Sequence, residues 1–135
     1  MIGSLFVTGA SGYLGRRFLA LAPSESQRNR IVCLNRAARS PVGGFETVRG
    51  DLTAGASYAS SLQGCETVVH MAATTGKNTP AEYFRINCEG TDALTEQCHV
   101  AGVKRILHVS TIAVTFPAID RYYYAQSKLA AETLI

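Results

Sequence analysis

Tryptophan is absent from this 135-residue sequence, proline and methionine are scarce, and the excess of positive charge is small. A net charge of +3, with no run of Lys and Arg longer than two residues, does not indicate a nucleic-acid-binding surface. No apolar segment approaches the ~20 residues that a helix needs to cross a bilayer, so we expect no membrane partner. Because the chain runs from Met1 directly into a strand-like segment, we also expect no signal peptide and a cytoplasmic protein.

Paired metal-binding cysteines are missing as well. The four cysteines, at positions 33, 65, 88 and 98, form no CxxC motif and no metal-ligand spacing. We therefore expect reduced, partly buried thiols and no metal site.

Apolar segments of two kinds alternate along the chain, which has the length and the 47% hydrophobic content of one globular domain, residues 1–135. Short strands are predicted at residues 4–8, 30–35, 46–49, 67–72 and 105–110. Helices are predicted at 12–21, 58–62, 79–101 and from 122 onward. In the first helix, Leu14, Phe18 and Leu21 are expected to share the buried face, with Pro23 ending the helix.

This alternation predicts an α/β fold, a doubly wound parallel sheet with strand order 3-2-1-4-5. A ligand crevice is expected between strands 1 and 4, where the winding reverses. No repeats or low-complexity segments are found.

Three glycines, Gly9, Gly12 and Gly15, follow the first predicted strand at a spacing of three. Glycines here allow a tight bend and a close approach of the backbone to a pyrophosphate, and the following helix supplies free N–H groups. A glycine triplet alone is often only a turn, but its place at the first strand–helix junction favours nucleotide binding.

A carboxylate that would bind a ribose is missing at the end of the second strand. Asn35 and Arg36 stand there, with Arg39 nearby. A guanidinium can pair with phosphate oxygens in a bidentate way, so Arg36 favours a cofactor with a 2′-phosphate. The alternative is an ordinary solvated arginine.

Tyr124 and Lys128, four residues apart, lie on one face of the last predicted helix. A tyrosine with its usual pKa of about 10 needs a lowering of ~2–3 units to act as an acid or base near neutral pH, and a nearby ammonium can provide it. Thr111 or Ser110, at the end of the fifth strand, can donate a hydrogen bond to a substrate oxygen. The Y-x-x-x-K pattern is common on helix surfaces, but its position after this strand favours proton transfer.

These residues resemble the extended, epimerase/dehydratase-like branch of the short-chain dehydrogenase/reductase family over essentially the whole chain. The resemblance implies a Rossmann-type sheet with a bound nicotinamide cofactor. The glycine segment resembles the family's TGxxGxxG, Gly50-Asp51-Leu52 its adenine-contacting segment, and His70-Met71-Ala72-Ala73 its HxAA segment. It implies cofactor contacts from Gly9, Ser11, Gly12, Tyr13, Leu14, Gly15, Arg36, Asp51, Leu52, Met71, Ala72, Ala73, Tyr124 and Lys128.

The catalytic set implied by the resemblance is Thr111, Tyr124, Lys128 and Asn87. Tyr124 would be the acid or base during hydride transfer, Lys128 would hold the ribose and lower the Tyr124 pKa, and Asn87 would join a proton relay. The expected protein is an NAD(P)-dependent oxidoreductase acting on a carbonyl or alcohol, with NADP expected and NAD possible.

Two other functions stay open. A sugar-nucleotide epimerase or dehydratase is disfavoured because Thr115-Phe116-Pro117 stands where such enzymes usually have Tyr-Gly. A non-catalytic NAD(P)-binding module or redox-sensing regulator is disfavoured because such proteins typically lose the Tyr/Lys pair.

Family members continue beyond the length of this chain. We therefore expect an amino-terminal part without the carboxyl-terminal strands and substrate lobe, with weak or no activity in isolation. The resemblance also implies a homo-oligomer formed through residues 80–101 and 122–135, which would bury Leu129 and Leu134.

Overall fold

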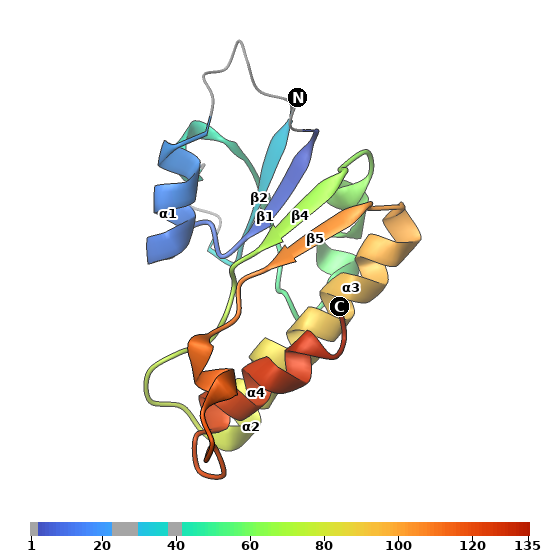
Figure 1. Ribbon diagram of the computed structural model, residues 1–135. Helices are drawn as coiled ribbons and strands as arrows, with labels where there is room; N and C mark the ends of the chain where they lie inside the picture. Colours follow the sequence, from blue (N-terminus) through green and yellow to red (C-terminus); the bar gives the residue numbers. More distant parts are fainter. Residues whose placement is uncertain (1–2, 23–29, 38–41) are drawn as a thin grey trace.

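Five parallel strands form one sheet in the order β3-β2-β1-β4-β5, which confirms the predicted topology. The computed structural model describes residues 3–22, 30–37 and 42–135 (Figure 1). Met1, Pro23 and Arg39, which carried predictions above, lie outside these ranges. The strands are β1 (Leu5–Thr8), β2 (Ile31–Asn35), β3 (Glu46–Arg49), β4 (Thr67–His70) and β5 (Arg105–His108).

The strands β4 and β5 are each two residues shorter than predicted, because the chain leaves the sheet at its carboxyl edge. The edge is still tied together after the strands end: Met71 N donates to Thr8 O at 3.2 Å, and Val109 N donates to His70 O at 3.0 Å. The loops that follow β1, β4 and β5 thus begin side by side, which places their residues around one crevice.

The face that the first helix, α1 (Tyr13–Ala20), buries differs in part from the one predicted: Phe18 is partly buried against the core as expected, but the two leucines are not. Leu14 and Leu21 are 53% and 86% exposed, whereas Gly15 and Leu19 are buried. The reason is Gly15: a Cβ there would lie 2.2 Å from Gly9 O, so this side of the helix rests directly on the glycine turn. The close backbone approach sets the helix rotation and overrides the hydrophobic pattern.

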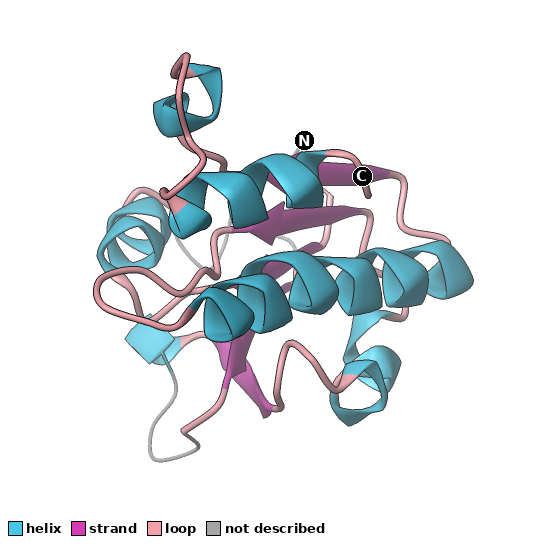
Figure 2. Ribbon diagram, turned by 90° about the horizontal axis from the view of Figure 1, so that it is seen from below, coloured by secondary structure: helices cyan, strands magenta, loops and turns pink. Residues whose placement is uncertain are grey.

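A long helical segment follows β4 and is not regular throughout. It comprises α2 (Pro80–Phe84), a π-helical turn (Arg85–Glu89) and α3 (Gly90–Ala101), and Figure 2 shows it crossing in front of the strands. The predicted start is confirmed, because the Thr79 hydroxyl accepts a hydrogen bond from Glu82 N at 3.2 Å. The predicted short helix at 58–62 is instead two 3₁₀ turns, Gly55–Ser57 and Ala59–Leu62.

The core is split by the sheet. On one side Leu5 and Val7 pack with Leu19 of α1; on the other Phe6 packs with Leu94 of α3 and with Tyr58. The last helix, α4 (Tyr123–Glu132), packs against α2 and the π-helical turn. In the described ranges, no helix is long and apolar enough to cross a membrane.

Candidate functional site

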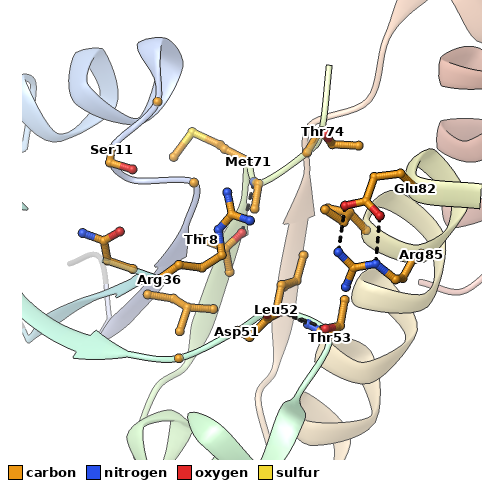
Figure 3. A pocket seen from close by; sticks show the side chains of 18 of the residues that line it. Thr8, Ser11, Arg36, Asp51, Leu52, Thr53, Met71, Thr74, Glu82 and Arg85 are labelled. Atoms are coloured by element: carbon orange, nitrogen blue, oxygen red, sulfur yellow. Dashed lines mark hydrogen bonds and ion pairs between the residues drawn. The ribbon is translucent and has the colours of Figure 1, made fainter. Parts of the chain in front are cut away.

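A pocket of about 480 Å³ lies at the carboxyl ends of the central strands, where the crevice was expected. The loops that follow β1 to β4 line it on most sides, and the segment from α2 to the π-helical turn closes it (Figure 3). Its lining comprises Thr8, Gly9, Ser11, Gly12, Leu34, Asn35, Arg36, Gly50, Asp51, Leu52, Thr53, Met71, Ala72, Ala73, Thr74, Asn78, Glu82, Arg85 and Ile86.

The glycine turn brings backbone to the floor of this pocket. Gly9 has φ +72°, and a Cβ on it would lie 2.6 Å from Ala72 N, so only glycine fits against the loop after β4. Gly12 begins α1, and the helix has no side-chain cap and no acidic residue in its first turn. Such an uncapped helix end offers N–H donors and a positive dipole to an anion.

The structure brings nine of the predicted cofactor contacts to the pocket and leaves three of the glycine-segment residues away from it. Gly15 lies behind the turn, and Tyr13 and Leu14 are exposed outside the pocket lining. The Arg17 guanidinium lies over the ring of Tyr13, with Arg17 Cζ 5.5 Å from the centroid of that ring. The nine lining residues are Gly9, Ser11, Gly12, Arg36, Asp51, Leu52, Met71, Ala72 and Ala73.

Charged groups face the pocket from two sides. Figure 3 shows Arg36 on the side of β1 and β2, and the Glu82–Arg85 ion pair, 2.8 Å long, on the opposite side. Asp51 accepts hydrogen bonds from the hydroxyl and N–H of Thr53 at 2.8 and 2.9 Å, and these bonds lower the pKa of its carboxyl, with smaller contributions from the two arginines. The pocket lining therefore has two carboxylates, Asp51 and Glu82, and two guanidinium groups, of which that of Arg85 is paired with Glu82.

Sequence reasoning missed the side of the pocket that is formed by Thr74, Asn78, Glu82, Arg85 and Ile86. A usable signal was present: three of these residues lie within five positions before Asn87, on the helical segment that the family resemblance already marked.

His70 is buried and neutral, and both of its ring nitrogens are engaged in hydrogen bonds, so it does not serve as a base. Thr91 donates its hydroxyl proton to Asn87 O at 2.7 Å, so Thr91 Oγ1 accepts from His70 Nε2 at 2.9 Å. The Thr8 hydroxyl accepts from Ala72 N at 3.2 Å and donates to His70 Nδ1 at 2.6 Å. Burial lowers the pKa of His70 to about 3. One neutral tautomer thus connects β1, β4 and the helical segment.

Asn87, in the π-helical turn, is 1% exposed and uses its whole amide group. Its Oδ1 accepts from Thr74 N at 2.7 Å, and its Nδ2 donates to Thr74 O at 3.1 Å and to Ser127 Oγ at 3.0 Å. Ser127 in turn donates to Tyr124 O at 2.8 Å. Asn87 therefore holds the first turn of α4 against the loop that follows β4.

Lys128 is 2% exposed and points from α4 to β5. Its ammonium donates to Val109 O at 2.8 Å and lies 3.1 Å from His108 Nε2. Burial lowers the pKa of Lys128 to about 8. The predicted effect on Tyr124 is not found: burial raises the pKa of Tyr124, whose ring packs against Tyr83 at 6.2 Å. The lysine does not lower this pKa here because its ammonium is directed to the strand.

Thr111 lies at the end of the segment after β5, as predicted, and its hydroxyl accepts from Ala113 N at 3.3 Å to cap a 3₁₀ turn, Ile112–Thr115. Thr111, Tyr124, Lys128 and Asn87 are not among the residues that line the pocket. In the described part of the chain, no three His, Cys, Asp or Glu side chains gather into a group that could hold a metal ion.

A parallel sheet wound in both directions from β1, with a glycine turn and a pocket at the reversal point, defines a Rossmann-type domain. The model of the NAD dependent epimerase/dehydratase family matches residues 5–135. The chain belongs to this family.

Two curated relatives are reductases. The ceramide reductase of Caulobacter vibrioides is 31% identical over 98% of this chain and 42% of its own length. The 4-hydroxy-2-methyl-3-oxo-4-farnesyl-3,4-dihydroquinoline-1-oxide ketoreductase of Stigmatella aurantiaca is 34% identical over 81% of this chain and 34% of its own length. The chain thus spans less than half the length of either relative.

A solved structure, MoeE5 in complex with UDP-glucuronic acid and NAD, matches 98% of this chain and 48% of its own, with a TM-score of 0.82 and 30% identity. The match supports the fold and adds a relative whose ligands are NAD and a sugar nucleotide.

Proposed function

We propose that residues 1–135 form the NAD(P)-binding domain of an oxidoreductase that transfers hydride to or from a carbonyl or alcohol. The pocket at the carboxyl ends of the strands, with an uncapped helix end at its floor, carries this proposal. The pyrophosphate would lie at the start of α1, and the adenine beside Asp51 and Leu52.

Arg36 favours NADP over NAD. Its side chain is exposed at the pocket, and β2 ends in Asn35, whose side chain accepts from Ala37 N at 3.3 Å. No carboxylate follows β2 directly in the sequence to bind a ribose 2′-hydroxyl; the carboxylates nearest in the pocket, Asp51 and Glu82, come from the loop after β3 and from α2. MoeE5 and another structural neighbour, WbmG of Bordetella bronchiseptica, were solved in complex with NAD, so a comparison of NADPH and NADH binding to this chain decides between the two cofactors.

The cofactor, when bound, supplies or receives the hydride. Tyr124 then gives a proton to the carbonyl oxygen in the direction of reduction, leaving an alcohol and an oxidised cofactor. Burial raises the pKa of Tyr124 in the chain without cofactor, so the phenol is protonated at neutral pH, and efficient proton transfer requires that the bound cofactor and substrate lower this pKa. Lys128 has three N–H donors, of which Val109 O and His108 Nε2 occupy two, and we propose that the third would donate to the cofactor ribose.

The reductase names of the two curated relatives support a ketone or alcohol as the substrate. A sugar-nucleotide epimerase or dehydratase is the second candidate, supported by the sugar nucleotide in the MoeE5 structure. Both reactions need the same proton-transferring tyrosine, and substrate trials on the full-length protein separate them.

The test is a Tyr124→Phe variant of the full-length protein that carries this sequence. Carbonyl-dependent oxidation of NADPH should slow by roughly 10²-fold or more, as expected for loss of a general acid, while NADPH affinity stays within about twofold. Tyr123→Phe is the matched control. Tyr123 directly precedes Tyr124 but has Ser127, not a lysine, four positions further on, so this variant should keep the rate.

Retention of the rate in Tyr124→Phe would remove Tyr124 from proton transfer. If the full-length protein binds the cofactor tightly but turns over none of the carbonyl, alcohol or sugar-nucleotide substrates, it is a regulator and not an enzyme.

A further inference from the structure

The ammonium of Lys128 contacts the last residue of β5 and the residue that follows it. It donates to the backbone carbonyl of Val109 at 2.8 Å, and it lies 3.1 Å from the side-chain nitrogen Nε2 of His108. We propose that His108 is a positioning residue, which accepts a hydrogen bond from Lys128 and so holds the ammonium in place one helical turn from Tyr124. The hydrogen bond itself does not depend on the proposed function. Only the role of Lys128 beside Tyr124 rests on it.

His108 is itself held by its neighbour in the sheet. His70 and His108 are register partners on β4 and β5, and their ring centroids lie 5.1 Å apart. His70 cannot turn, because both of its ring nitrogens are bound, one to Thr8 and the other to Thr91. The orientation of the lysine therefore depends on side chains that reach back to β1 and the pocket.

The contact requires one particular tautomer of His108. An ammonium can only donate, so Nε2 must present a lone pair, and the ring proton of the neutral imidazole must then be on Nδ1. His108 Nδ1 is buried and has no hydrogen-bond partner among the described residues. A buried N–H without an acceptor is unfavourable, so on this ground alone the proton would be expected on Nε2. The hydrogen bond that Nε2 accepts from the Lys128 ammonium favours the proton on Nδ1 instead.

The charges around His108 agree with a neutral ring. Lys128 and Glu132 face it from α4, and His70 faces it from β4. Glu132 is occupied in part, because its carboxylate accepts a hydrogen bond from Ser110 Oγ. Burial is the main cause that lowers the pKa of His108 to about 4. We therefore expect the neutral imidazole beside the charged amine, the pair that the Lys128–His108 hydrogen bond joins, between about pH 4 and about pH 8.

The tautomer can be read in the unmodified chain. Long-range ¹H–¹⁵N NMR spectra at pH 7 should show His108 protonated at Nδ1, with Nε2 unprotonated. A proton on Nε2 would overturn the proposal, because that nitrogen could not accept from the ammonium. This measurement needs no substitution and no turnover.

The second test follows the Lys128 amine by NMR in two variants. In His108→Leu the charged amine loses an acceptor, so its pKa should fall by roughly one unit below that in the unmodified chain. Gln can place its Oε1 near the position of Nε2, so His108→Gln should restore the pKa. His99→Leu is the matched control, since His99 is exposed on α3, and it should leave Lys128 unchanged.

The proposal would be overturned if the Lys128 pKa were unchanged in folded His108→Leu. It would also be overturned if the Lys128 pKa fell as far in His108→Gln as in His108→Leu. If His108→Leu does not fold, the tautomer in the unmodified chain decides. In the full-length protein, His108→Leu should shift the alkaline limb of the pH profile of kcat to lower pH, by the same roughly one unit as the Lys128 pKa. The lysine measurement does not depend on turnover, so failure of the proposed function leaves its result readable.

Discussion

Replacing Gly15 by alanine should destabilise the chain by about 2 kcal/mol, because the new methyl group would meet backbone and not side chain. An ideal Cβ at Gly15 lies 2.2 Å from Gly9 O and 2.6 Å from Ala10 Cα, so α1 must move away from the turn as a body. Overpacking costs typically about 1–3 kcal/mol, and contact with backbone places this site at the upper end. The better helix propensity of alanine returns about 1 kcal/mol.

Urea unfolding measures this difference. With a slope of about 2 kcal/mol per M urea, the midpoint should fall by about 1 M at an unchanged slope. Gly90→Ala is the matched control, because it is also a helical glycine but its Cβ would meet side chains and not backbone, namely Leu52 Cδ2 at 2.9 Å, Leu52 Cγ at 3.1 Å and Thr53 Cγ2 at 3.6 Å. A side chain can shift more easily than backbone, so Gly90→Ala should lower the midpoint by less than Gly15→Ala does. Equal midpoints for Gly15→Ala and the unmodified chain would refute the claim that backbone contact fixes α1.

Three further outcomes follow from the pocket, the buried histidines and the helices after β4 and β5. Arg36→Ala should weaken NADPH binding about tenfold and leave NADH binding within about twofold; equal losses for both would assign Arg36 to another contact. The pKa values of His70 and His108 are lowered on folding, so the unfolded chain binds more protons below about pH 6.5, and stability should fall from there toward pH 4. His70 alone accounts for up to about 1.4 kcal/mol per pH unit, and a urea midpoint that stays constant over this interval would contradict its burial as a neutral ring. We expect a dimer that buries Leu129 and Leu134, and light scattering that gives the mass of one chain at micromolar concentration would exclude it.

The strand order and the location of the pocket could be predicted from the sequence because both depend on alternation along the chain. Parallel strands linked by helices leave few possible windings, and the glycine turn after β1 marks the edge where ligands bind. The error in α1 arose where hydrophobicity was the only guide. Leu14 and Leu21 match a helical stripe, yet the contact of Gly15 with Gly9 O decides which face is buried.

The arrangement around Lys128 could not be predicted from spacing. The four-residue interval correctly placed Tyr124 and Lys128 on one helix, but it does not determine the direction of a long, flexible amine. That direction depends on Val109 O and His108, which the sheet brings from another part of the chain. Likewise the segment around Asn87 has ordinary helical residues, and its π-helical turn accompanies hydrogen bonds to Thr74 and Ser127, 13 and 40 residues away. His108, a polar residue directly after the apolar Ile106 and Leu107, was the one available signal for this contact.

Fluorescence titration of this chain with NADPH and NADH tests the proposed dinucleotide site most directly. We expect saturable binding of one NADPH per chain, tighter than that of NADH, with competition by ADP because the adenosine and pyrophosphate contacts lie in the described pocket. Tighter binding of NADH would remove the 2′-phosphate contact from Arg36 while keeping the site. Absence of saturable binding of either nucleotide to the folded chain would contradict the assignment of the pocket.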